Sequence, residues 1–211
     1  MNAVKTTLTT NAIFSDDGTK RYLLTKTWDA SKPKLAIIML APSEASGVVL
    51  DSTTMLVLNN AARLGYGTVT ALNLFATLND SDLKQAELDD EENLKIIVSA
   101  AQNADLVVYA AGVGKARNKL FQERQKQVLT ELKPIEHKMF CLCDARGEAR
   151  LQHPLSPAVR TWELSPLKIS ELLPEAEVKP EPPKKGKKPA KKRNLLHERK
   201  PPCSATGAGW L

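Results

Sequence analysis

Four short aliphatic segments, separated by longer segments of helical periodicity, constrain the fold of this chain more than any other feature. They cover residues 34–40, 68–75, 105–111 and 138–143. The first is an almost unbroken aliphatic run, which is typical of a strand that is buried on both faces, and the others are also rich in apolar residues. Strands that alternate with helices of ten or more residues predict a mostly parallel sheet that helices cover on both faces. We therefore expect an α/β fold, a three-layer sandwich.

The segments between these strands carry the pattern of amphipathic helices. We expect helices over residues 52–64, 89–101 and 115–132, where apolar side chains recur at helical spacing. At the N-terminus, residues 12–14 and 21–28 flank an Asp-Asp-Gly turn signal. This pattern predicts a hairpin or a pair of edge strands at the side of the sheet.

The basic charge of the chain is concentrated near its C-terminus. The 211 residues carry a formal net charge of +6, but residues 179–200 hold ten Lys or Arg and two Glu, so the rest carries −2. From residue 174 onward the chain has few apolar residues and many prolines and charges, so it cannot bury enough surface to offset the entropy of ordering. We expect one domain over residues 1–173 and a disordered tail over residues 174–211.

The tail is also the expected contact with nucleic acid, either DNA or RNA. A run of basic side chains gains affinity for phosphates through the release of counterions. A solubilising role is the alternative. The basic residues concerned are Lys184, Lys185, Lys187, Lys188, Lys191, Lys192 and Arg193.

Several classes of protein are excluded by what the sequence lacks. No run of about 18 apolar residues is present, so a membrane protein is not expected. Three cysteines cannot form a disulfide framework, which favours a cytoplasmic protein. The H-E-x-x-H, C-x-x-C and G-x-S-x-G motifs are absent, so we expect no metal site, no cofactor and no α/β-hydrolase chemistry. The oligomeric state stays open.

Candidate site residues lie where the central strands end, because ligands of open α/β sheets bind beyond the carboxyl ends of the strands. Loops 41–46 and 112–115 follow the first and third strands, Asn73 ends the second, and segment 153–156 follows the fourth. The loop at 112–115 lacks the spacing of a phosphate-binding P-loop. The expected ligand-binding residues are Pro42, Ser43, Asn73, Phe75, Gly112, Pro154 and Ser156.

Three of the residues in these segments carry distinctive chemistry. The amide of Asn73 offers both donors and an acceptor for the edge of a nucleobase, or it pairs with a neighbouring loop. His153 is a candidate proton donor, because histidine titrates near neutrality, or it is a residue of a rigid turn before proline. Glu44 is the ionisable residue of loop 41–46 and could orient a water, although an exposed loop glutamate is the commoner explanation. Glu44 and His153 are therefore the catalytic candidates.

The order of these segments resembles a known family. The strings LAIIMLAPSEAS, LDSTT, LGYG, ALNLFAT, VVYAAGVG and QHPLS occur in this order. Together they resemble the bacterial and phage family called domain of unknown function 1643, over about residues 12–173. That family usually has an asparagine in the first loop, at the position that Ala41 occupies in this chain.

The same segments are also similar to the uracil-DNA glycosylase superfamily. That resemblance implies that Pro42 matches the proline of the catalytic loop and that Asn73 reads the base. It also implies that His153, Pro154 and Ser156 form the last loop of the site. Ala41 lies where the resemblance places the water-activating residue, and an alanine can neither orient a water nor stabilise charge.

These observations predict an α/β protein that binds a nucleobase or nucleic acid, either without catalysis or with an action on a base–sugar linkage. The resemblance implies a glycosylase-like architecture, with an atypical catalytic loop because of Ala41. Two alternatives stay open. One is a non-catalytic accessory protein whose basic tail binds nucleic acid, and the other is an enzyme that acts on free nucleotides.

Overall fold

The computed structural model describes the whole chain except residues 44–46, 79–87, 89, 114–117, 149 and 174–211. Met1–Glu175 form one compact unit. The second unit, Ala176–Leu211, lies outside the described residues, and so does the expected basic tail.

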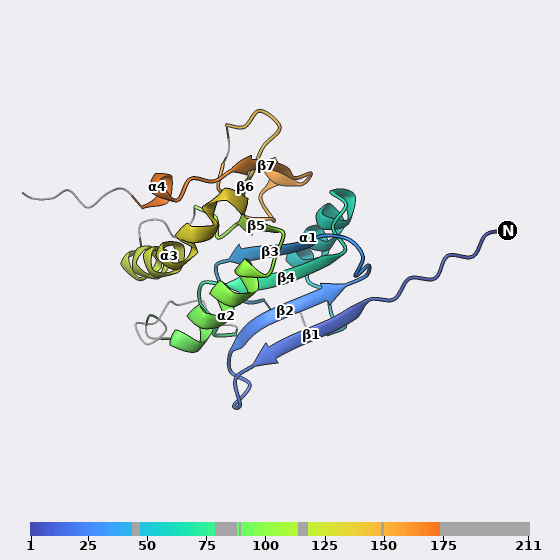
Figure 1. Ribbon diagram of the computed structural model, residues 1–211, viewed down its shortest axis with the longest axis horizontal. Helices are drawn as coiled ribbons and strands as arrows, with labels where there is room; N and C mark the ends of the chain where they lie inside the picture. Colours follow the sequence, from blue (N-terminus) through green and yellow to red (C-terminus); the bar gives the residue numbers. More distant parts are fainter. Residues whose placement is uncertain (44–46, 79–87, 89, 114–117, 149, 174–211) are drawn as a thin grey trace, which may run out of the picture. The chain divides into compact units, whose positions relative to one another are not determined.

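The four aliphatic segments form the centre of a seven-stranded sheet, as the sequence predicts (Figure 1). The strand order is β1-β2-β4-β3-β5-β6-β7. The central strands are β3 (Lys34–Met39), β4 (Thr68–Asn73), β5 (Leu106–Tyr109) and β6 (Met139–Cys143). Neighbouring strands of this group run parallel, so their carboxyl ends lie at one edge of the sheet.

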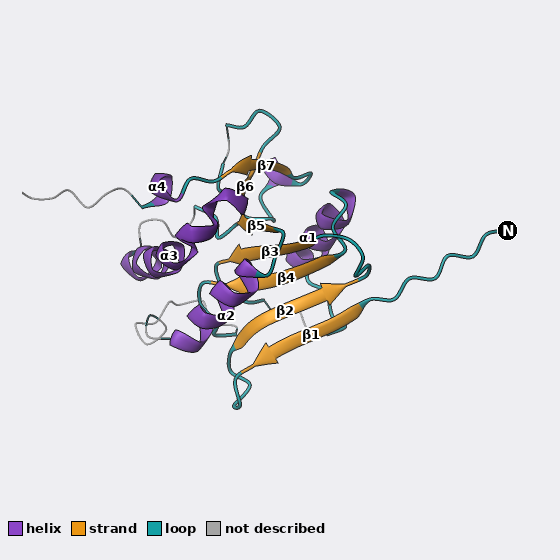
Figure 2. Ribbon diagram, in the orientation of Figure 1, coloured by secondary structure: helices purple, strands orange, loops and turns teal. Residues whose placement is uncertain are grey.

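Antiparallel strands flank this parallel centre (Figure 2). The expected hairpin is confirmed: β1 (Thr9–Phe14) pairs antiparallel with β2 (Arg21–Thr27), and β2 pairs antiparallel with β4. At the other edge, β7 (Glu163–Pro166) pairs antiparallel with β6. The sequence did not predict β7, because the segment ELSP shows neither an aliphatic run nor a regular alternation.

Helices cover both faces of the sheet and give the expected three layers. One face carries α1 (Ser52–Arg63), and the other carries α2 (Glu91–Gln102) and α3 (Lys119–Leu132) (Figure 1). Three short elements complete the described chain: the 3-10 helices Lys133–Lys138 and Pro157–Val159, and α4 (Ile169–Leu172).

The core lies in two layers, one on each side of the central strands. On the α1 side, Ile37, Val69 and Val108 pack with Val57 and Trp162. On the opposite side, side chains of the same strands pack with α2 and α3, among them Ile38, Leu72, Val107, Ile97 and Val128. The sheet is thus buried on both faces, which explains the unbroken aliphatic runs.

Two buried polar side chains donate hydrogen bonds to the main chain at the carboxyl end of β4. Asn93 of α2 donates from Nδ2 to the main-chain oxygens of Asn73 and Leu74, each at 3.1 Å. Arg124 of α3 donates from Nε to the oxygen of Leu74 at 2.9 Å, and from its terminal nitrogens to those of Leu88 and Asp90. Asn93 and Arg124 are each 1% exposed. They satisfy carbonyls that water does not reach, and they tie both helices to this strand end.

We predict that Arg124→Met lowers the free energy of unfolding by roughly 2–4 kcal/mol, because it removes the hydrogen bonds of a buried guanidinium to the main-chain oxygens of Leu74, Leu88 and Asp90. Urea denaturation measures this loss. Lys119→Met, which removes an exposed cation from the same helix, is the control and should change stability by less than about 0.5 kcal/mol. Equal stability of the two variants would contradict the structural role of Arg124.

Candidate functional site

A pocket of about 610 Å³ lies beyond the carboxyl ends of the parallel strands. Three segments form its wall, and they follow β3, β5 and β6. We call it the strand-end pocket. Its lining residues are Leu40, Ala41, Ala111, Gly112, Val113, Gln152, His153, Leu155 and Ser156. Of the expected site residues, the structure therefore brings Gly112, His153 and Ser156 together.

Gly112 packs directly against His153. The glycine has a φ of +77°, a conformation that other residues rarely adopt. A Cβ at this position would lie 3.3 Å from the Cβ of His153. A side chain at residue 112 would therefore strain the backbone and crowd His153.

The segment that carries His153 is held by its own hydrogen bonds and by the sheet. The amide of Gln152 donates to the oxygen of Leu142 in β6 at 3.3 Å, and that of Ser156 donates to the oxygen of His153 at 2.8 Å. The hydroxyl of Ser156 donates to Oε1 of Gln152 at 2.9 Å. These hydrogen bonds hold residues 152–156 in a defined turn.

The continuation of this segment is anchored on α1. Trp162 is fully buried in the core, and its amide donates to Oδ1 of Asn60 at 3.0 Å. The Nδ2 of Asn60 donates to the oxygen of Arg160, also at 3.0 Å. These contacts fix the chain just beyond the pocket.

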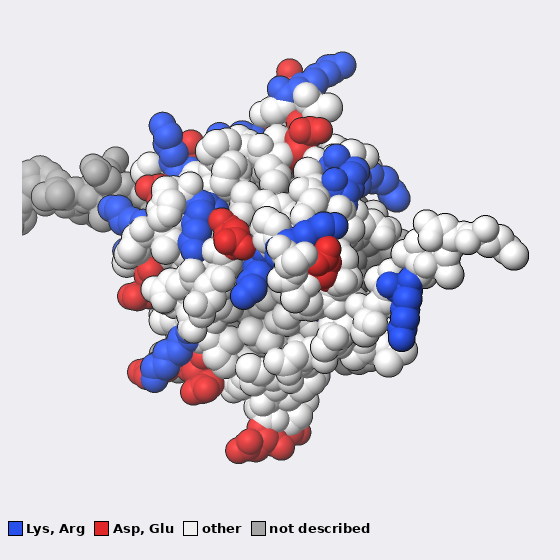
Figure 3. Space-filling model, turned by 45° about the vertical axis from the view of Figure 1, so that its right-hand side comes forward, with Lys and Arg blue, Asp and Glu red and all other residues white. Residues whose placement is uncertain are grey.

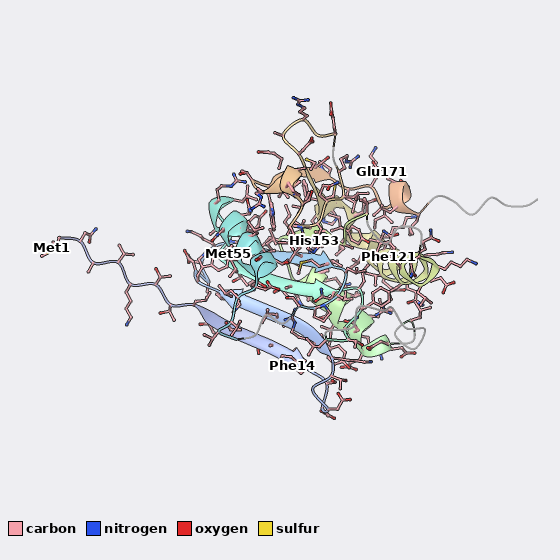
Figure 4. All side chains as sticks on the ribbon, turned by 180° about the vertical axis from the view of Figure 1, so that it is seen from behind. Met1, Phe14, Met55, Phe121, His153 and Glu171 are labelled. Carbon is pink, nitrogen blue, oxygen red and sulfur yellow. The ribbon has the colours of Figure 1, made fainter. Side chains whose placement is uncertain are left out.

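The imidazole of His153 is arranged as a neutral hydrogen-bond donor. Its Nδ1 accepts from the amide of Leu155 at 3.2 Å, so the proton of the neutral ring is on Nε2. Burial lowers the pKa of His153, and the negative charge of Asp51 opposes this shift. His153 is partly buried, and it is labelled in Figure 4. At neutral pH the ring therefore presents Nε2–H.

Arg21 and Asp51, which the sequence did not predict as site residues, form a charged cluster with Ser43, which it did. Arg21 is 2% exposed and donates from its terminal nitrogen to the oxygen of Ser43 at 3.1 Å. Asp51 caps α1 by accepting from the amide of Thr54 at 2.6 Å. Burial raises the pKa of Asp51, but hydrogen bonds from Ser43 and Thr54 and the charge of Arg21 bring it below its ordinary value. The cluster holds an ionised carboxylate at the start of α1.

The structure places Asn73 at the end of β4 but not on the wall of the pocket. Val69 and Ala71 pack on the α1 side of the sheet, so alternation along β4 directs Asn73 to the same side. The residue is 1% exposed, and its Nδ2 has no hydrogen-bond partner among the described residues. A buried donor without an acceptor costs free energy, and the lining of the pocket does not include this residue.

The other expected residues that the structure describes do not line the pocket, and Ser43 contacts Arg21 instead. Phe75 is 1% exposed and packs in the core on the side of α2 and α3. Pro42 and Pro154 are buried and support the turns beside the pocket. Glu44, Lys115 and the basic residues of the tail lie outside the described residues.

Asp51 had a signal that the sequence analysis passed over. An aspartate that precedes Ser-Thr-Thr at the start of a helical pattern is a strong helix cap, and a capping carboxylate at a strand-to-helix connection lies near the ligand edge of the sheet. Arg21 carries no such signal, because its place in a strand does not disclose its burial.

Neither a metal site nor a membrane span is found in the described part of the chain. No group of three or more His, Cys, Asp or Glu side chains there could hold a metal ion. No helix there is long and apolar enough to cross a membrane. On the face shown in Figure 3, basic and acidic side chains are mixed, without a continuous basic surface.

Most of the chain, including the segments that form the pocket, matches a model of a protein family. Residues 21–155 match the family model described as a protein of unknown function, DUF1643. The chain belongs to the DUF1643 family. The match confirms the resemblance to this family. It runs from Arg21 to Leu155, so it includes the Arg21 cluster and every lining residue of the pocket except Ser156. No curated protein matches the chain.

We predict that the imidazole of His153 titrates below pH 6.5, because burial disfavours its charged form. The imidazole therefore binds a proton more readily in the unfolded chain than in the folded one. As the pH falls below the ordinary pKa of histidine, this residue lowers the free energy of unfolding. Asp51→Asn should lower the pKa further, since it removes the opposing charge and keeps a capping oxygen. Proton NMR of the ring measures both values, and a midpoint above 6.5, or one that rises in the variant, would contradict this account.

Proposed function

We propose that the strand-end pocket of this DUF1643 protein binds a nucleobase, either in a nucleotide or in a nucleic acid. The observation that carries the proposal is the convergence of three separate segments on one pocket that contains a neutral imidazole donor. A volume of about 610 Å³ lies in the range of small-molecule sites. Apolar walls at Leu40, Ala41 and Ala111, together with polar groups at His153 and Ser156, suit a flat ring with a polar edge.

The similarity to the uracil-DNA glycosylase superfamily supports the same ligand class. In that superfamily, as in this chain, the site loops follow the strands in the same order and the last loop contains a His-Pro segment. We include this similarity in the proposal. Under it, His153 and Ser156, which line the pocket, contact the ligand. Fold likeness does not by itself transfer an activity, so the ligand class rests on the pocket.

Binding is better supported than cleavage of a base–sugar bond. Cleavage needs a group that orients a water and groups that stabilise the developing charge. Ala41 supplies neither, and His153 is the ionisable residue among those that line the pocket in the described structure. Cleavage, in nucleic acid or in free nucleotides, would need another group such as Glu44, which lies outside the described residues.

A second candidate function follows from the distribution of charge. The chain carries −2 outside residues 179–200, so electrostatic attraction to nucleic acid belongs first to the tail. In this account the α/β domain is a non-catalytic accessory and only the tail binds.

The test is a titration of the full-length chain with the four ribonucleoside monophosphates and with short DNA and RNA oligonucleotides, by calorimetry in 0.3 M salt. High salt weakens phosphate contacts of the tail. We predict that His153→Asn lowers affinity for the preferred mononucleotide about tenfold, because asparagine keeps an acceptor for the amide of Leu155 and removes the Nε2 donor.

The control is His137→Asn, an exposed histidine in the 3-10 helix that precedes β6, away from the carboxyl edge. This variant should bind as the wild type does. If no mononucleotide binds and oligonucleotide binding disappears when the tail lysines are replaced by glutamine, the tail-only account holds and the pocket proposal is wrong.

A further inference from the structure

We infer that the protein binds at least two consecutive nucleotides of a single strand, because a second pocket adjoins the strand-end pocket across Gly112 and Val113. This inference rests on the proposed function. The second pocket has a volume of about 430 Å³ and lies between α3 and α4. We call it the α3–α4 pocket.

The two pockets share their dividing wall. Gly112 and Val113 line both of them. Leu151 lines the α3–α4 pocket, and the next residue, Gln152, lines the strand-end pocket. Val113 is 56% exposed, so the ridge between the pockets is open to solvent at this residue. A ligand that fills one pocket can therefore continue into the other over the backbone of Gly112.

The chemistry of the α3–α4 pocket suits a second nucleobase. Its lining is mostly apolar: Leu151, Leu172 and Leu173 line it, and Tyr109 and Phe121 lie beneath it with 1% and 2% of their surface exposed. Two amides, those of Gln122 and Gln125, also line it, and Nε2 of Gln125 donates to the hydroxyl of Tyr109 at 2.8 Å, which orients that amide. Single-stranded nucleic acids are bound by this combination of apolar or aromatic surface with side chains that read base edges.

The charged side chains at this pocket would not repel a phosphate group. Lys126 is exposed on α3 and lines the pocket. The lining carboxylate, Glu171, is paired with Arg150 at 3.1 Å, so its negative charge is offset. A phosphodiester that crosses the ridge would therefore meet one cation and no uncompensated carboxylate from the described lining residues. A free nucleotide fills a single pocket, whereas two joined nucleotides use both pockets and the ridge.

The experiment compares the preferred ribonucleoside monophosphate with the dinucleotide of the same base, using the full chain and calorimetry at 0.15 M salt. The dinucleotide should bind at least about tenfold more tightly, because the second base enters its pocket as part of a ligand that is already bound. Lys126→Glu and Gln122→Leu should remove most of this gain and leave the affinity for the mononucleotide unchanged. Both residues are exposed, so neither variant disturbs the core.

The matched control is Lys133→Glu, which makes the same charge change at an exposed position just after α3 and lines neither pocket. It should keep the full gain. Equal affinity for the mononucleotide and the dinucleotide, or a gain that Lys126→Glu and Gln122→Leu leave intact, overturns this inference while the strand-end pocket stands. Failure of the wild type to bind the mononucleotide, or binding that His153→Asn does not weaken, overturns the proposed function instead.

Discussion

The end of β4 depends on buried donors that its own strand neighbours do not supply. The chain leaves the sheet at Asn73 and Leu74 with carbonyl oxygens in the interior, and Asn93 and Arg124 satisfy them. One donor comes from α2 and the other from α3, so the same hydrogen bonds fix both helices relative to the carboxyl edge of the sheet. α3 in turn forms one side of the α3–α4 pocket. A polar network inside the core thus sets the geometry of the ligand edge.

The sequence predicted the centre of the fold because the central strands are buried on both faces and therefore read as aliphatic runs. The three main helices were predicted because each buries one stripe against the sheet. The edge elements differ. The strand β7 pairs with β6 alone, and β7 and α4 are each only four residues long, so their segments carry too little apolar pattern to indicate a strand or a helix.

The candidate site was predictable in part. Parallel strands bring their carboxyl ends to one edge, and this topology alone places Gly112, His153 and Ser156 together. It does not decide which way a side chain points, so Phe75 lies in the core instead of on the pocket wall. Arg124 lies three residues after Phe121 and four before Val128, within the apolar stripe of α3. That spacing indicates a buried side chain, whereas the charge of the residue suggests an exposed one. The side chain is buried, because it donates hydrogen bonds to main-chain oxygens at the end of β4.

The central claim is that a nucleobase occupies the pocket formed by the segments after β3, β5 and β6. Amide chemical shifts of the labelled full-length chain, recorded during a titration with the preferred mononucleotide, test it most directly. The account predicts that the largest shifts occur at Ala41, Gly112 and Ser156, with smaller changes at residues far from the carboxyl edge. Shifts confined to the C-terminal tail, or to the opposite edge of the sheet, would contradict it.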